Sequence, residues 1–146
     1  MQANIIEPQD IYSRIYRENV ALITQEDEEL IYRAIAAAIS EVKMYLSRYD
    51  LPALFGDGHS AAPVSDMFLK NLCVDIAVWR LLLLGCPGIS HATARECYES
   101  ALNYLRDIQA MRASPDGWPY RDTTASTAPQ GNTVEAAYIP KRFNDF

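Results

Sequence analysis

The residues that could do chemistry in this chain are few and lie far apart. Its 146 residues include two histidines and three cysteines, and none of these stands at the spacing of a zinc site. No glycine-rich phosphate loop, zinc-protease motif or nucleophile elbow occurs in the sequence. Cys86, between Gly85 and Pro87, is the one thiol expected in an exposed turn, and a catalytic role for it is the weaker interpretation. The sequence therefore predicts a protein that is not an enzyme and that has no cofactor and no metal ion.

Asp75 and Arg80 are two of the four charged residues in a long, mainly apolar stretch. Side chains five positions apart do not share one helix face, so these two are poorly placed to pair with each other. Burying a charge is costly unless the charge is paired, so each residue is expected to contact another helix or another subunit. An ion pair within the chain is the favoured alternative, and a contact at a subunit seam is the second. The candidate partners are Arg48, Arg95 and Glu99.

The stretch that carries these charges, Ser65 to Gly85, predicts the central buried helix of the protein. From Met67 to Leu84 it is apolar on most sides, which is typical of a helix that neighbours cover on several faces. Ser65 is the expected N-cap, and Gly85 with the following Pro87 ends the helix. The stretch is nearly long enough to span a membrane, but the charges spread along it make that interpretation the weaker one.

Three further helices are expected around this one. Apolar residues recur at helical spacing in residues 8–18, 25–49 and 90–113. Thr24 is the expected N-cap of the second of these helices, and Val20 to Ile23 would connect it to the first. Residues 50–64 are expected to form a loop in which Leu54 and Phe55 fold back onto the core. The expected buried face of the last helix consists of Ala94, Cys97, Tyr98, Ala101, Leu102, Leu105, Ile108 and Met111.

The chain changes character after residue 113. Residues 114–146 contain four prolines, two glycines and no helical period, so they predict a long, largely irregular tail in which residues 133–138 could form a short strand. Large apolar residues are spaced through the tail, whereas disordered tails are poor in them. We therefore expect the tail to dock, either on its own chain or on another. Its expected partner-binding anchors are Trp118, Tyr120, Tyr138, Ile139, Phe143 and Phe146.

Together these elements predict an all-α protein, with a bundle of about four helices in residues 1–113 and an extended docking tail in residues 114–146. The net charge is −6 at pH 7 and the pI is about 4.8, which argues against a generic electrostatic grip on DNA or on an anionic membrane. The first residues lack the basic start and apolar run of a secretory signal. The odd number of cysteines suits reduced thiols in a cytoplasm.

Several short motifs follow one another in a fixed order along residues 7–110. In the first half they are Pro8-Gln9-Asp10-Ile11, Leu22-Ile23-Thr24, Ala34-Ile35 with Ala38, Tyr45-Leu46, Arg48-Tyr49 and Leu51-Pro52. In the second half they are Asp75-Ile76-Ala77, Trp79-Arg80-Leu81 and, in the last expected helix, Arg95, Tyr98, Ala101-Leu102, Leu105 and Ile108. In these motifs the chain resembles a family of small phage and prophage proteins, the Mu-like head–tail connector (neck or adaptor) proteins.

The resemblance implies a structural virion protein without a catalytic site. Such a protein would form a homo-oligomeric ring, of about twelve subunits, below the portal of a tailed phage. The ring would extend the DNA channel and dock the tail, so the implied partners are further copies of the chain, the portal protein and a tail or tail-completion protein. DNA would only pass through. The expected location is the neck of the virion, after synthesis in the cytoplasm of a bacterial host. The alternative is a small helical phage regulatory or DNA-packaging factor, against which the acidic pI and the lack of a basic recognition helix argue.

Overall fold

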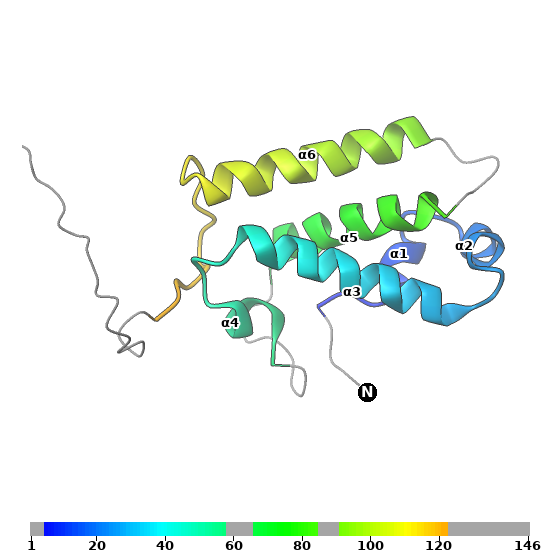
Figure 1. The fold of residues 1–146 in the computed structure, drawn as a ribbon, viewed down its shortest axis with the longest axis horizontal. Helices are drawn as coiled ribbons and strands as arrows, with labels where there is room; N and C mark the ends of the chain where they lie inside the picture. Colours follow the sequence, from blue (N-terminus) through cyan, green and yellow to red (C-terminus); the bar gives the residue numbers. More distant parts are fainter. Residues whose placement is uncertain (1–4, 58–65, 85–90, 123–146) are drawn as a thin grey trace, which may run out of the picture.

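The computed structural model describes residues 5–57, 66–84 and 91–122. Within these residues the protein is all-α, as the sequence predicts, with six helices and no strand. The helices are α1 (Pro8–Tyr12), α2 (Arg17–Thr24), α3 (Glu28–Tyr45), α4 (Leu51–Phe55), α5 (Met67–Leu82) and α6 (His91–Gln109). Helices α3, α5 and α6 lie side by side as the body of the molecule, with α1 and α2 toward one end and α4 near the other (Figure 1). None of the six helices is both long enough and apolar enough to cross a membrane.

Helix α5 packs against both α3 and α6, which confirms the prediction of a central buried helix. Its buried residues include runs of consecutive positions that a single helix face cannot hold. They are Leu69, Leu72, Cys73, Val74, Ile76, Ala77, Val78, Leu81 and Leu82. The prediction of the N-cap was wrong, because Asp66 caps the helix with a carboxylate oxygen 3.0 Å from the backbone nitrogen of Leu69. Ser65 itself lies outside the described residues.

The first part of the chain differs from the prediction of one helix followed by a connector. Residues 13–16 break the helix between α1 and α2, and the expected connector belongs to α2. Thr24 is the last residue of α2, not an N-cap, and its hydroxyl donates to the carbonyl of Val20 at 2.9 Å. The residue after it, Gln25, has a left-handed backbone with φ 54°, which ends α2. Asp27 caps α3 instead, accepting from the backbone nitrogen of Glu29 at 3.0 Å.

The long helix expected over residues 25–49 is shorter in the structure and is followed by a further helix. Helix α3 ends at Tyr45, and Asp50 caps the short helix α4 by accepting from the backbone nitrogen of Ala53 at 3.2 Å. Pro52 lies in the first turn of α4, where no intrahelical N–H bond is lost. Leu54 and Phe55 on α4 are buried, so the prediction that they fold back onto the core is confirmed.

The last helix, α6, buries Ala101, Leu105 and Ile108 against the bundle, in line with the predicted face. Met111 was placed on that face, but it is 59% exposed. The difference arises because α6 ends at Gln109 and Met111 has φ 63°, which turns the chain away from the helix axis. The turn directs the following residues back toward the start of α5 and the end of α3 (Figure 1).

Candidate assembly surfaces

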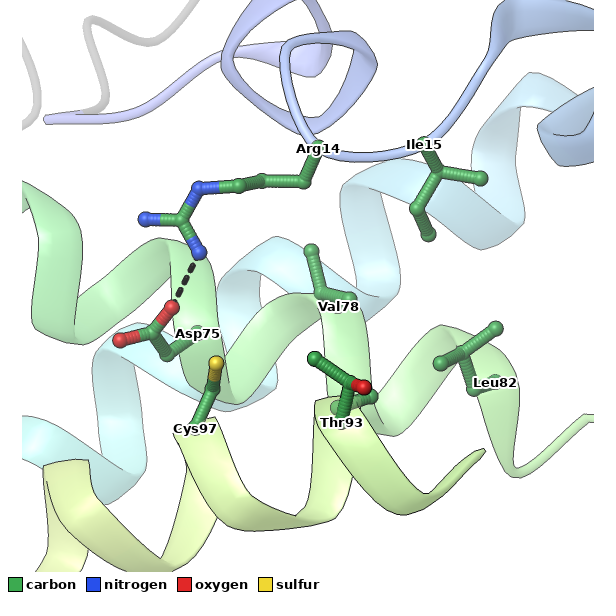
Figure 2. A pocket seen from close by; sticks show the side chains of 8 residues that line it. Arg14, Ile15, Asp75, Val78, Leu82, Thr93 and Cys97 are labelled. Atoms are coloured by element: carbon green, nitrogen blue, oxygen red, sulfur yellow. Dashed lines mark hydrogen bonds and ion pairs between the residues drawn. The ribbon is translucent and has the colours of Figure 1, made fainter. Parts of the chain in front are cut away.

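Asp75, on α5, forms an ion pair with Arg14 in the turn between α1 and α2. The pair borders a cavity of about 250 Å³ that lies between this turn, α5 and α6. Figure 2 shows the guanidinium of Arg14 directed at the carboxylate of Asp75, with the thiol of Cys97 rising from α6 beside them. The rest of the lining is mainly aliphatic, with Ile15, Val78, Leu82, Thr93 and Ala94. The pair therefore joins two parts of the same chain over an otherwise apolar hollow.

Arg80 makes its ion pair with Glu41 on α3. The same carboxylate also accepts a hydrogen bond from the hydroxyl of Tyr98 on α6, at 3.0 Å, so it joins three helices. Burial, and then the hydrogen bond to Glu41, raises the pKa of Tyr98 above its usual value. The ring of Trp79 stacks on that of Tyr98 with 5.7 Å between the centroids. The carboxylate of Glu41 on α3 thus connects α3 to both α5 and α6 through polar contacts.

Neither charge uses a partner that the sequence suggested. Arg48 donates to the carbonyl of Gln109 at the end of α6, 3.2 Å away, where helix carbonyls lack intrahelical donors. Arg95 pairs with Glu99 one turn along α6, with its Nε atom 3.0 Å from the carboxylate. That pair is exposed on the helix surface and contributes little to stability. The candidate partners were therefore wrong, and the actual partners come from α3 and from the α1–α2 turn.

Trp118, one of the expected partner-binding anchors, is buried in its own chain and is only 4% exposed. Its indole nitrogen donates to the carboxylate of Asp66 at 2.8 Å. Its ring meets the ring of Tyr49 edge to face, with centroids 5.6 Å apart. Because Asp66 also caps α5, one carboxylate connects the start of the central helix to the tail.

The residues after Trp118 pair with the backbone that leaves α3. The backbone nitrogen of Asp50 donates to the carbonyl of Pro119 at 2.9 Å, and that of Arg121 donates to the carbonyl of Arg48 at 3.0 Å. Between them lies an antiparallel bridge from residue 49 to residue 120. Their side chains, Tyr49 and Tyr120, stack with centroids 5.0 Å apart. The other expected anchors, Tyr138, Ile139, Phe143 and Phe146, lie outside the described residues, as does the expected strand at 133–138.

A second cavity, of about 440 Å³, opens beside Trp118 between the start of α5 and the end of α6. We call it the α5–α6 cleft, and its lining residues are Asp66, Phe68, Tyr104, Ile108, Ala113, Ser114, Pro115 and Asp116. The rings of Phe68 and Tyr104 meet edge to face with centroids 5.4 Å apart. They are 38% and 52% exposed, so the cleft offers aromatic surface to the outside.

Phe68 and Tyr104 were not among the contact residues predicted from the sequence. A signal was nevertheless present for Tyr104, because it falls between buried positions of α6 and off the predicted face. An aromatic residue on the outer side of an amphipathic helix is a candidate contact residue. Phe68 had no such signal, since it lies in a stretch that is apolar almost throughout.

Apolar side chains are also exposed at the opposite end of α5. Leu83 and Leu84, just beyond its last residue, are 61% and 53% exposed. We call these two residues the far-end patch. The 16 residues of α5 separate it from the α5–α6 cleft by about 24 Å at the usual rise per residue. In the described residues, apolar surface is thus exposed at both ends of α5, and it is aromatic at one end and aliphatic at the other.

Among the residues that the structure describes, no group of three or more histidine, cysteine or acidic side chains could hold a metal ion. The described residues define an all-α bundle with residues 118–121 packed back onto it and apolar groups exposed at both ends of its central helix. The chain matches the model of the family described as "Bacteriophage Mu, Gp36" over residues 6–135. It belongs to this family of phage proteins. The match includes all six helices and extends into the tail. No curated protein and no solved structure matches the chain significantly.

Proposed function

We propose that this phage protein is a structural subunit of the virion, a head–tail connector that forms a ring below the portal. In this role the ring extends the DNA channel and docks the tail or a tail-completion protein. Family membership supports a role in the phage, and the exposed surfaces support the finer role in assembly. The protein then acts by binding its neighbours rather than by catalysis.

The observation that carries this proposal is the pair of unlike apolar surfaces at the two ends of α5. Exposed apolar groups that gather in one place commonly mark protein contacts. A symmetric dimer uses one surface that matches itself, whereas two different surfaces favour head-to-tail association, which closes into a ring when the rotation allows. The aromatic α5–α6 cleft and the aliphatic far-end patch differ in this way, so each would meet a different part of a neighbouring subunit.

The charge of the chain is compatible with a DNA channel. With a net charge of −6, the protein lacks the general attraction for phosphates that holds DNA-binding proteins on duplex DNA. An acidic wall lets DNA slide past without being held. Asp75 and Arg80, two of the three charged residues of α5, are paired inside the chain, so the bundle has its own internal polar links before any assembly takes place.

Native mass spectrometry and electron microscopy of the full chain test the proposal. We expect ring-shaped particles of a single subunit number, and we expect the protein in purified virions. Leu84→Asp should shift the rings toward monomers without lowering the melting temperature, because the side chain is exposed. Met44→Asp is the matched control, because Met44 on α3 is also apolar and exposed but lies outside the α5–α6 cleft and the far-end patch. It should leave the rings intact. A protein that remains monomeric at all concentrations and is absent from virions would overturn the proposal, and salt-dependent binding to duplex DNA would favour the regulatory or packaging alternative.

A further inference from the structure

We propose that the α5–α6 cleft of one subunit receives the C-terminal residues 138–146 of a second copy of the chain. This inference rests on the proposed ring and names one of the contacts that would hold it together. It gives the cleft a specific occupant, which is a segment of the same sequence.

The cleft suits an apolar segment that also carries positive charge. Its walls are formed by Phe68 and Tyr104, and the ring of Trp118 lies 6.4 Å from that of Phe68, between their centroids. Aromatic edges and faces favour other aromatic side chains and also cations. Two carboxylates, Asp66 and Asp116, belong to the lining, and that of Asp116 is exposed to solvent. The volume of about 440 Å³ is large enough for two or three side chains.

The segment has the matching composition. Residues 138–146 read Tyr-Ile-Pro-Lys-Arg-Phe-Asn-Asp-Phe, so a basic pair lies between large apolar residues, with one acid, Asp145, after it. Lys141 and Arg142 are the only basic residues in the sequence after Arg121, in a chain whose net charge is −6. Pro140 has no backbone N–H and disfavours helix at the residue before it, which suits a segment that binds in an extended form. Apolar side chains would fill the cleft while the basic pair meets the exposed carboxylate of Asp116.

The described backbone ends on the side of α3 and α4, and the remaining chain is long enough to reach the cleft of a neighbour. After Trp118 the backbone does not turn toward α6 but pairs with residues 48–50, on the side of α3 and α4 (Figure 1). Residues 123–137 then provide a reach of up to about 50 Å when extended, which exceeds the length of α5. A tail bound in its own cleft would be favoured by effective concentration but would make no contact between subunits. A tail exchanged with a neighbour gives each copy one donor and one acceptor, which is the condition for a closed ring.

The test is a photo-crosslink in the full-length protein. Benzoylphenylalanine replaces Phe143, and subunits labelled with ¹⁴N and ¹⁵N are mixed before assembly. We expect crosslinks to peptides that contain Phe68 or Tyr104, with about half of them joining a light peptide to a heavy one. Crosslinks that are confined to a single isotope would show binding within one chain, and crosslinks that avoid the cleft would show another partner surface. Either result would overturn the inference.

A surface variant with a matched control completes the test. Tyr104→Lys places a cation opposite the basic pair and should lower the yield of mixed-isotope crosslinks at least tenfold. Asn103→Lys adds the same charge at the neighbouring exposed position of α6, outside the cleft lining, and should leave the yield unchanged. Circular dichroism checks that both variants are folded. Equal yields in the two variants would overturn the inference.

Rings that form without cleft crosslinks would overturn this inference but leave the proposed function standing. A wild-type chain that forms no ring would count against the proposed function itself.

Discussion

The contact between Asp66 and Trp118 leads to the most informative stability prediction. The carboxylate caps α5 at the backbone nitrogen of Leu69 and accepts the indole N–H at 2.8 Å. An aspartate N-cap contributes about 1 kcal/mol, and a hydrogen bond to a charged group about 1.5–3 kcal/mol. Because Asp66 is only half-buried, we take the lower part of that range. Asp66→Ala should therefore reduce the free energy of unfolding by about 2–3 kcal/mol.

Trp118→Phe removes the same N–H donor and retains an aromatic ring at this position. It should cost about 1.5–3 kcal/mol, from the lost hydrogen bond and from the smaller ring against Tyr49. Since both single variants break the same hydrogen bond, the double variant should be more stable than the sum of the two losses predicts. The expected coupling energy is about 1–2 kcal/mol. Urea unfolding followed by far-UV circular dichroism measures all four proteins without relying on tryptophan emission.

Asp27→Ala is the matched control for this cycle. Asp27 also caps a helix through its carboxylate, but it is exposed and its carboxylate caps only α3. Its replacement should cost about 1 kcal/mol and should add to the loss from Trp118→Phe without coupling. A coupling energy between Asp66 and Trp118 below about 0.3 kcal/mol would refute the reasoning, because the tail would then be held by packing alone.

Three further predictions compare positions within the bundle. Leu72 is 2% exposed and Leu83 is 61% exposed. In urea titrations, Leu72→Ala should therefore lower the free energy of unfolding by about 2–5 kcal/mol. Leu83→Ala should lower it by less than about 0.5 kcal/mol. Equal losses would contradict the observed end of α5. Glu41→Gln weakens two hydrogen bonds to one largely buried carboxylate, so it should lower the free energy of unfolding by about 1–3 kcal/mol. Glu99→Gln changes an exposed ion pair and should lower the free energy of unfolding by no more than about 0.5 kcal/mol. Thermal melts of the two variants test this difference. Burial raises the pKa of the Cys73 thiol to about 12. The thiol of the unfolded chain ionises near pH 8.5, at about its ordinary pKa, so the stability contributed by this group is complete below that pH and is lost as the pH rises toward 12. Urea midpoints measured between about pH 8 and 10 should therefore fall, and Cys73→Ala should make the fall shallower; an unchanged slope would show that Cys73 is not the group responsible.

The body of the fold could be predicted because its helices bury dense, periodic apolar residues. The ends of the helices could not, and three aspartates explain why. Asp27, Asp50 and Asp66 each stand immediately before a helix and cap it. The sequence predicted Thr24 as the cap where Asp27 serves, a loop from residue 50 onward, and Ser65 as the cap where Asp66 serves. A short polar side chain can take any of these roles, and the choice depends on backbone angles that the packed helices determine.

The ion pairs of α5 show a different limit. A buried or half-buried charge predicts that a partner exists, but it does not say which residue the partner is. Arg14 reaches Asp75 because the helix breaks at residues 13–16 and the turn lies over α5, and that break was not predicted. Glu41 reaches Arg80 because α3 packs along α5 in one particular register. Both partners depend on tertiary packing, so side-chain type and sequence spacing could not identify them.

The contacts of Trp118 in the tail also depend on tertiary packing. Large apolar residues in an irregular segment predicted anchors, and the described part shows how the first of them is used. Trp118 binds Asp66 and Tyr49 of its own chain, so it is not free for a partner, and its ring instead lies beside Phe68 at the cleft. The first part of the tail therefore helps to build the surface to which, in our proposal, the last part of another tail binds. It follows that Trp118→Phe should weaken assembly as well as stability, whereas substitutions confined to residues 138–146 should weaken assembly alone.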